Sequence, residues 1–499
     1  MVGLLLSLEW VRGAQVPTGV AYPAGALVWV DDTPYLALVC GHTGSDFTTD
    51  NQWYDVVADT WIVQSSFAGA ARYDAGGCAA LFAGDPNFWV FSGSEADAWS
   101  FTVYSDYYRY DPQADAWTRV GTMPRDAIGE GVRAASLGDT IYIVGGHDSD
   151  GMSYDSTKRS LYRYVPSDDS WTKLSPLPAP DGLADQAWIA CGDKIYSFGG
   201  VAIDAAYNYY FVNDAYEYDP ATDSWRTITP LPGSARSGVA AAVLGGKVWL
   251  IGGTGGDPFN PTDYPDVYIY DPSTDTYQPG PFLPAAHDGG AAIGVPLSVY
   301  EVELSEPSDG AAVDCQCDTF RWQPLEPTRI VYAGEGTATS VTNYTYLLKS
   351  DIDYYIFRIS EDPSFSTYFE DTTSSTSYEY CFTSADDGKT FYWSVLAVDE
   401  LGDTSSMDTF SLTVECSLFS GSEQPAPGLT LRLIGSKLII EGLRGEARVR
   451  VYRADGRLEL SRRISGPGRV EITLNLPSGV YWVKVEARGE RRTLRAVLR

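Results

Sequence analysis

A motif that returns about every 54 residues constrains the fold of this chain more than any other feature. Its clearest copies, Tyr-x-Tyr-Asp-Pro-x-x-Asp-x-Trp, run from Tyr108 to Trp117 and from Tyr216 to Trp225. Weaker copies bring the number of units to five. The aromatic residues that close the five units are 56, 54, 54 and 52 residues apart: Trp61, Trp117, Trp171, Trp225 and Tyr277. Such a regular period indicates a repeat architecture rather than one irregular core.

A second marker precedes each closing aromatic: an apolar run that ends in glycine. The five runs are Leu36–Gly41, Phe88–Gly93, Ile141–Gly146, Ile195–Gly200 and Val248–Gly253. Apolar alternation, aromatic residues and Gly/Pro turns at this period predict four short strands in each unit. Units of this kind are the blades of a β-propeller.

An aspartate stands two residues before each closing aromatic. Aspartate suits tight turns because its side chain bonds nearby backbone N–H groups and because it tolerates the left-handed conformation. Five carboxylates at one repeated position also resemble an array of metal sites, but a turn requires no ligand. We predict turn residues at Asp59, Asp115, Asp169, Asp223 and Asp275.

These markers resemble the kelch repeat, with its double glycine and its Tyr and Trp at fixed spacing. A proline also lies seven residues after four of the closing aromatics, at Pro124, Pro178, Pro232 and Pro284. The resemblance covers about residues 16–302 and implies a kelch β-propeller. Five units are complete, residues 284–302 open a sixth, and Trp10 is expected to lie on an outer strand that closes the ring. We predict an all-β chain with a propeller of six blades at residues 16–296, five or seven blades being the alternatives.

The period is lost after the propeller, and residues 297–416 show short alternating strands of a different kind. Examples are Thr319–Gln323, Tyr354–Ser366 and Phe391–Asp399. A buried Trp early and an aromatic pair late are typical of a β-sandwich of about a hundred residues. The segment resembles a fibronectin type III domain, which implies a spacer or adhesive module.

The seven cysteines are unevenly placed. Cys40, Cys78 and Cys191 are scattered through the propeller and are predicted to be small buried hydrophobic residues. Four others lie within one stretch of about a hundred residues, at Cys315, Cys317, Cys381 and Cys416. We expect one or two disulfides among these four if the protein is exported.

The charge changes sign near the C-terminus. Residues 424–499 contain 16 Lys and Arg against 7 Asp and Glu, so the net charge of −31 divides into −40 before this segment and +9 within it. Residues 417–428 are a predicted linker, and residues 429–499 a small β-sandwich with an Asp-Gly hairpin turn. Val451–Arg457, Leu476–Val485 and the final strand Thr493–Arg499 resemble the C-terminal sorting domain of the type IX secretion system. That resemblance implies export across a Gram-negative outer membrane by the type IX machinery, with removal of the tail or its exchange for a surface anchor left open.

Composition excludes several classes of protein. The strongly acidic balance argues against nucleic acid as a partner, and no apolar run approaches the ~20 residues of a membrane-spanning helix. The short apolar stretch within residues 1–15 is either a truncated signal segment or an ordinary strand.

All three histidines are predicted to lie on one face of the propeller. His42 and His147 open loops between second and third strands, and His287 lies between a fourth and a first strand; both kinds of loop emerge on the same face. Long loops rich in aromatic and acidic residues lie on that face, and the acidic residues include Glu130 and Asp185. Such a surface suits sugars, basic protein segments or Ca²⁺. The predicted binding-face residues are His42, His147, His287, Trp99, Tyr104, Tyr209, Arg125, Arg236 and Asp148.

Catalytic motifs are scarce: the sequence contains no nucleophile elbow, P-loop, CxxC or HExxH. Some secreted kelch propellers are copper radical oxidases, and Cys40 lies two residues from His42, although no Tyr is obviously paired with it. We therefore predict a secreted or cell-surface binding protein that recognises a glycan or protein through propeller loops. No cofactor is expected; the alternatives are bound Ca²⁺ or Cu, and an extracellular carbohydrate-active or copper radical oxidase-like enzyme.

Overall fold

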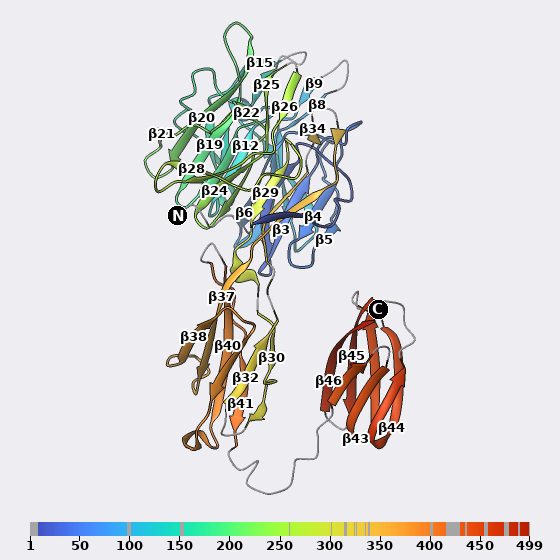
Figure 1. Ribbon diagram of the computed structural model, residues 1–499. Coiled ribbons are helices and arrows are strands. Elements are labelled where there is room, and N and C mark those ends of the chain that lie inside the picture. The colour runs from blue at the N-terminus through green and yellow to red at the C-terminus, as the bar shows by residue number, and fades with distance from the viewer. Residues whose placement is uncertain are drawn as a thin grey trace. The chain divides into compact units, whose positions relative to one another are not determined.

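The structure is a computed structural model that divides into two compact units, Met1–Glu415 and Cys416–Arg499 (Figure 1). Each unit is described by itself. The described residues are 8–96, 101–149, 154–258, 260–300, 302–313, 317–323, 325, 327–334, 336–337, 340–399, 403–415, 430–434, 437–453, 458–473, 479–487 and 490–498.

The first unit contains six four-stranded antiparallel sheets, which are the blades of the propeller. Blades 1 to 5 each use four strands in chain order, from the innermost to the outermost. Blade 1 is β2 (Ala24–Val30), β3 (Thr33–Val39), β4 (Asn51–Asp55) and β5 (Thr60–Val63); blade 2 is β6 (Gly76–Phe82), β7 (Asp85–Phe91), β10 (Asp106–Asp111) and β11 (Ala116–Thr122); blade 3 is β12 (Arg133–Leu137), β13 (Thr140–Val144), β16 (Leu161–Val165) and β17 (Ser170–Lys173); blade 4 is β18 (Ala187–Cys191), β19 (Lys194–Ile203), β20 (Tyr209–Asp219) and β21 (Ser224–Ile228); blade 5 is β23 (Ala240–Leu244), β24 (Lys247–Ile251), β27 (Val267–Asp271) and β28 (Thr276–Pro279).

Blade 6 is assembled from distant parts of the chain. Its strands are β29 (Ala291–Gly294), β33 (Thr328–Ala333), β36 (Thr345–Lys349) and, outermost, the N-terminal β1 (Glu9–Arg12). Trp10 of β1 lies opposite Leu348 of β36, so the predicted N-terminal outer strand is present. Residues 1–7 lie outside the described residues.

The boundary predicted at residue 296 does not separate the propeller from the sandwich. After β29 the chain enters the sandwich, returns to blade 6 for β33 and β36, and enters the sandwich again. All six residues of β33 are buried, because this strand completes the core of the blade. A weak signal for it is present in the sequence, since Ile330–Gly334 (IVYAG) is another apolar run ending in glycine.

In blades 1 to 5, the repeated aspartate and its closing aromatic join the blade to the preceding one, an arrangement we term the rim clamp. In blade 4, Asp223 Oδ1 accepts hydrogen bonds from the Tyr218 hydroxyl at 2.8 Å and from the backbone N–H of Ser175 at 2.9 Å. Trp225 Nε1 donates to the Ser175 carbonyl at 2.9 Å, and Ser175 follows the outer strand of blade 3. The predicted turn role is confirmed, because all five aspartates have φ between 46° and 54°.

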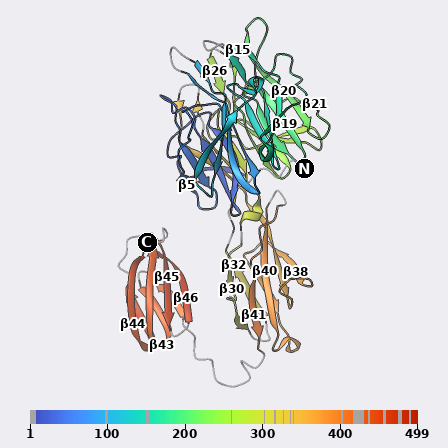
Figure 2. The ribbon, with the colours of Figure 1, turned by 180° about the vertical axis from the view of Figure 1, so that it is seen from behind.

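Among the described residues, the sandwich forms two sheets (Figure 2). Aromatic side chains from both sheets pack between them. Phe320, Phe357 and Trp393 are fully buried there, and Phe320 contacts both other rings. One sheet has the order β30 (Leu304–Glu306), β32 (Cys317–Trp322), β39 (Ser377–Cys381); the other has the order β31 (Ala311–Val313), β41 (Phe410–Val414), β40 (Thr390–Asp399), β37 (Ile352–Ser360), β38 (Phe369–Thr373).

A buried ion pair fixes the sandwich to blade 6. Arg329 of β33 lies 3.2 Å from Asp399 of β40, and its guanidinium also donates to Asp403. Both Arg329 and Asp399 are almost fully buried, so replacing Arg329 alone should be strongly destabilising, because it leaves buried carboxylate charge behind.

The cysteines follow the prediction where they are described. Cys40, Cys78 and Cys191 are free and buried. Cys381 is disulfide-bonded and lies opposite Cys317 in the sandwich register. Cys315 and Cys416 lie outside the described residues.

The second unit forms one antiparallel sheet of five described strands: β42 (Thr430–Ile434), β43 (Lys437–Arg453), β44 (Leu458–Thr473), β45 (Gly479–Ala487) and β46 (Glu490–Leu498). Leu438, Ile440, Val449, Val451 and Ile472 are buried, which agrees with the predicted period-two alternation. The predicted Asp-Gly hairpin turn lies outside the described residues.

The remaining elements are short. Loop hairpins of the propeller are β8 (Ser94–Ala96) with β9 (Phe101–Val103), β14 (His147–Ser149) with β15 (Tyr154–Thr157), β22 (Arg236–Ser237) with β25 (Thr254–Asp257) and β26 (Asn260–Asp263), and β34 (Gly336–Thr337) with β35 (Ser340–Val341). Single 3₁₀ turns are η1 (Arg125–Ala127), η2 (Pro166–Asp168), η3 (Leu297–Val299) and η4 (Ser384–Asp386). No helix in the described part of the chain is long and apolar enough to span a membrane.

Candidate functional site

A closed ring of backbone hydrogen bonds surrounds the central channel. One residue shortly before the innermost strand of each blade donates its N–H to the carbonyl of the corresponding residue in the preceding blade, at 2.8–3.2 Å. The sixth bond, from Tyr22 to Gly289, returns to the start of the ring. These ring residues are Tyr22, Asp74, Gly131, Asp185, Gly238 and Gly289, and all have φ between 52° and 67°.

Three of the six ring residues are not glycine, although this left-handed conformation favours glycine. Aspartate tolerates it moderately well, and tyrosine is a genuine outlier there. Residues in strained backbone conformations are common at functional sites, where the strain is part of the mechanism. Tyr22, Asp74 and Asp185 therefore mark one mouth of the channel as the place to look for function.

Arg133 links the two ring aspartates. Its guanidinium donates to Asp74 Oδ1 at 2.8 Å and to Asp185 Oδ1 at 2.9 Å. Burial, and then the charge of Asp185, raises the pKa of Asp74 well above its usual range. Burial alone would also raise the pKa of Asp185, but Arg133 and His147 outweigh it and lower that pKa.

Two more buried carboxylates, those of Asp288 and Glu130, lie at the mouth. The Tyr22 hydroxyl donates to Asp288, which is buried beside the ring. Burial raises the pKa of Asp288 to about 7, and the charges of Asp263 and Asp185 act in the same direction. Glu130, also buried, accepts hydrogen bonds from the hydroxyls of Tyr73 and Ser94. The mouth thus contains four buried carboxylates and the guanidinium of Arg133.

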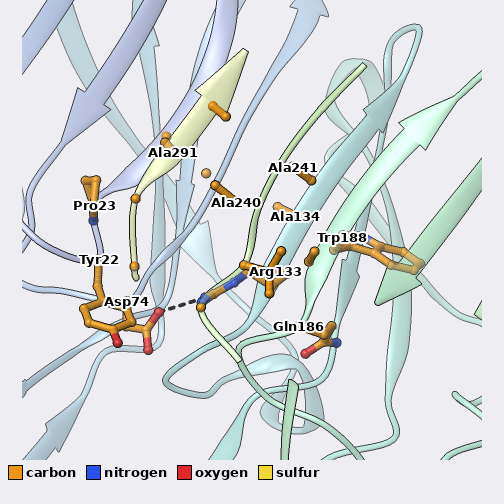
Figure 3. A pocket seen from close by; sticks show the side chains of 18 of the residues that line it. Tyr22, Pro23, Asp74, Arg133, Ala134, Gln186, Trp188, Ala240, Ala241 and Ala291 are labelled. Atoms are coloured by element: carbon orange, nitrogen blue, oxygen red, sulfur yellow. Dashed lines mark hydrogen bonds and ion pairs between the residues drawn. The ribbon is translucent and has the colours of Figure 1, made fainter. Parts of the chain in front are cut away.

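The ring opens into a cavity of about 130 Å³ lined by innermost strands of all six blades. Figure 3 shows Tyr22, Asp74, Arg133 and Gln186 towards one end, and Ala134, Ala240, Ala241 and Ala291 along the strands. Gln186 is 1% exposed, and neither its Oε1 nor its Nε2 has a hydrogen-bond partner in the described part of the chain. A buried amide without partners costs about 1–3 kcal/mol and calls for an explanation.

Comparisons with known proteins agree with this architecture. Residues 121–281 match the family model described as the KLHDC2/KLHL20/DRC7 Kelch-repeats domain. The chain contains a kelch β-propeller. Kelch-like protein terF of Aspergillus terreus is 29% identical over 305 residues, which cover 58% of this chain and 62% of that protein.

Two further matches are more partial or more distant. An N-acetylneuraminate epimerase of Haemophilus influenzae is 30% identical over 172 residues, covering 29% of this chain and 45% of the epimerase. The solved structure described as "Structure of YjhT" is 15% identical, with a TM-score of 0.48, over 72% of this chain and 99% of that one. The chain spans less than two thirds of the length of the two curated relatives named here.

The three histidines lie on the predicted face of the kelch propeller but in separate surroundings. His42 pairs with Ala21 and its ring contacts Phe47. His147 stacks on Tyr209 and lies 3.5 Å from Asp185. His287 Nε2 lies 3.2 Å from the Tyr346 hydroxyl.

The structure brings His147 and Tyr209 to the channel mouth and places the other predicted binding-face residues elsewhere. Arg236 is buried, donates to Asp266 at 3.0 Å and stacks over Tyr264, so it supports loops of blade 5. Tyr104 stacks on Arg72, which plays the same supporting part in blade 2.

Two more of these residues lie at the outside of the loop face, and one is not described. Arg125 is exposed on η1, and Asp148, also exposed, lies 3.4 Å from Lys158. Trp99 lies outside the described residues.

Among the described residues, no group of three or more His, Cys, Asp or Glu is arranged to hold a metal ion. Cys40, two residues from His42, is buried in the core of blade 1, and burial raises the pKa of its thiol to about 12. A thiol in this state is mainly protonated at neutral pH.

The prediction included Asp185 and Glu130 as acidic loop residues but missed Tyr22, Asp74, Arg133, Gln186 and Asp288. A signal was available, because the ring residue precedes the innermost strand by a short, constant interval. The ring residues become visible only when the short segments before the six innermost strands are aligned with one another. That alignment must include the segment before β29, which belongs to blade 6.

Proposed function

We propose that this protein is an extracellular binding protein whose kelch propeller recognises a saccharide at the channel mouth. The observation that carries the proposal is the set of polar side chains on the backbone ring, at positions where three other blades use glycine. The Asp74 carboxylate and the Arg133 guanidinium line the cavity, and each can pair with sugar hydroxyls, which both donate and accept hydrogen bonds. Tyr22 adds aromatic surface to the cavity lining.

One relative supports a sugar as the ligand. The Haemophilus influenzae protein is named as an N-acetylneuraminate epimerase, and its match covers 29% of this chain. That name also favours a second candidate function, an enzyme that converts a saccharide in the propeller. Incubating the protein with N-acetylneuraminate and following its anomers and epimers by NMR separates the two, since a binding protein leaves the exchange rates unchanged.

We propose further that the protein is exported to the surface or surroundings of a Gram-negative bacterium. The basic C-terminal sheet, its resemblance to a type IX sorting domain and the disulfide at Cys381 support this. Deleting residues 424–499 should trap the protein in the periplasm of a bacterium that has this system. Unchanged export of the shortened chain would contradict the role of the tail.

The binding function is tested with labelled full-length protein on an array of oligosaccharides. We expect a defined set of sugars to be bound and the signal to be lost in Asp74→Asn. Asparagine adopts the left-handed conformation readily and still accepts a hydrogen bond from Arg133. The control is Asp139→Asn, an exposed carboxylate in the turn between β12 and β13. Failure to bind any sugar, or equal binding by Asp74→Asn and the wild type, would contradict the proposal.

A further inference from the structure

A second cavity, of about 520 Å³, lies at the junction of blade 6 and blade 1, and we term it the seam cavity. Three segments that are distant in sequence line it: residues 17–19 after β1, Thr43 after β3, and residues 341–344 at the end of β35 and before β36. These segments connect a second to a third strand or a fourth to a first strand. The seam cavity therefore opens on the same face of the propeller as the channel mouth.

The seam cavity lies close to the mouth. Gly19 is three residues from the ring residue Tyr22, and three residues span at most about 11 Å. Thr43 follows His42, which pairs with Ala21, the residue directly before Tyr22. A ligand at the mouth that is longer than one sugar unit can therefore extend into the seam cavity.

None of the described side chains that line the seam cavity is charged, although the chain contains 66 acidic residues. The lining includes the hydroxyls of Thr18 and Thr43, the exposed amide of Asn343 and the aromatic ring of Tyr344. Hydroxyl and amide groups both donate and accept hydrogen bonds, as sugar hydroxyls do. A neutral sugar unit matches this lining, whereas a charged ligand finds no opposite charge in it.

Hydrogen bonds hold the walls of the seam cavity in place. The buried Gln52 side chain donates to the Thr18 carbonyl at 3.0 Å and accepts from the Thr18 N–H at 2.7 Å. On the other wall, the Asn343 carbonyl accepts a hydrogen bond from the Val16 N–H at 3.0 Å. Walls that are fixed in this way lose little conformational freedom when a ligand binds.

Tyr344 supplies an aromatic surface in a fixed orientation. The Arg12 guanidinium carbon lies 3.9 Å from the centre of the Tyr344 ring, and Tyr346 contacts this ring edge-on at 6.0 Å. Tyr344 is nevertheless only half-buried, and it lines the cavity. An aromatic side chain that is held in this way can pack its apolar surface against a sugar ring while its hydroxyl stays polar.

We propose that the propeller binds an oligosaccharide of at least two units, with one neutral sugar unit in the seam cavity beside the unit held at the mouth. This inference rests on the saccharide-binding function proposed above. The mouth supplies the charged partners Asp74 and Arg133, and the seam cavity supplies neutral hydroxyl, amide and aromatic partners. Once one unit is bound, the linked unit meets its own subsite at a high effective concentration, so a longer chain binds more tightly.

The test is calorimetric titration of the full-length protein with saccharides of increasing length. The probes are the monosaccharide, disaccharide and tetrasaccharide of glucose, galactose, mannose and N-acetylglucosamine. We expect at least one series to bind, and its tetrasaccharide to bind at least about ten-fold more tightly than its monosaccharide.

The outcomes distinguish the inference from the function on which it rests. A tetrasaccharide that binds no more tightly than its monosaccharide would overturn the inference and leave saccharide binding in place. Failure of all four series would also overturn the inference. It would overturn the proposed function as well only if the oligosaccharide array described above showed no binding.

Two variants assign the gain with chain length to the seam cavity. Tyr344→Leu keeps the apolar volume but removes the ring, and it should weaken tetrasaccharide binding about five-fold and leave monosaccharide binding unchanged. Thr18→Val removes one hydroxyl and keeps the backbone bonds to Gln52, so it should weaken tetrasaccharide binding in the same direction. If Tyr344→Leu also loses the monosaccharide, Thr18→Val decides alone.

The matched control is Tyr368→Leu in the sandwich, where the Arg358 guanidinium carbon lies 4.9 Å from the centre of the Tyr368 ring. This variant should bind the tetrasaccharide as the wild type does. Wild-type binding by both Tyr344→Leu and Thr18→Val, or an equal loss in Tyr368→Leu, would overturn the assignment of a sugar subsite to the seam cavity.

Discussion

The rim and the mouth of this propeller both repeat from blade to blade but use their side chains differently. At the rim, an aspartate in the left-handed conformation recurs in all five repeated units, where it accepts hydrogen bonds that fix the turn and join the preceding blade. At the mouth, the backbone ring recurs in every blade, but its side chains are Tyr, Asp, Gly, Asp, Gly and Gly. Uniform side chains on a uniform backbone indicate a structural role, whereas the varied side chains of the mouth are the basis of the proposed binding function.

The largest predicted effect concerns closure of the ring, on which both regions depend. A fragment ending at residue 300 lacks β33 and β36, so β1 loses its pairing partner and blade 6 loses its core. We expect this fragment to show no cooperative thermal unfolding and no near-ultraviolet circular dichroism of packed aromatic rings.

The fragment 1–415 is the matched control, because it keeps every described strand of the propeller and sandwich. It should unfold cooperatively. Native-like unfolding of the shorter fragment would show that the ring does not need blade 6.

The mouth should make stability depend on pH in a way that the rim does not. The pKa of Asp288 is raised to about 7 by burial and by Asp263 and Asp185, while Tyr22 opposes the shift. Between its ordinary pKa of about 4 and 7, the folded state binds more protons than the unfolded state. The free energy of unfolding contributed by this group therefore falls as pH rises through that window.

We expect Asp288→Asn to flatten this dependence by up to about 1.4 kcal/mol per pH unit. Denaturant unfolding at several pH values, compared with the wild type, measures the difference. Parallel curves for the two proteins would contradict the assignment of a raised pKa to Asp288.

At the rim, Asp223→Ala should lower the free energy of unfolding by about 2 kcal/mol. The change removes hydrogen bonds from Tyr218 and Ser175 and places alanine at φ 48°. Asp193→Ala, which removes an exposed carboxylate from the same blade, should change stability by less than about 0.5 kcal/mol. Asp223→Ala should leave sugar binding unchanged. Loss of binding in this variant would contradict the assignment of a purely structural role to the rim.

The sequence predicted the rim far better than the mouth, for a physical reason. A clamp such as Asp223 with Trp225 needs the same residues in each blade, so it leaves a period that is visible in one chain. Kelch units, the turn aspartates and the N-terminal strand around Trp10 were predictable in this way.

The mouth leaves no such period, because its side chains differ from blade to blade. Asp74 and Arg133 meet only when the ring closes, and they are 59 residues apart in sequence. Blade 6 was hidden for a related reason: the sandwich interrupts it, and its glycine marker survives only as Ile330–Gly334. Arg236 is a different case, because the sequence does not show that this loop arginine is buried against Asp266 and Tyr264.

The most direct test of the contrast between rim and mouth is the stability and sugar binding of Asp74→Asn. Asparagine keeps the left-handed conformation and an acceptor for Arg133, whose other carboxylate partner, Asp185, is unchanged. We predict that the free energy of unfolding changes by less than about 1 kcal/mol, while sugar binding is lost. A loss of more than about 1 kcal/mol of stability with binding intact would show that the mouth, like the rim, serves the fold.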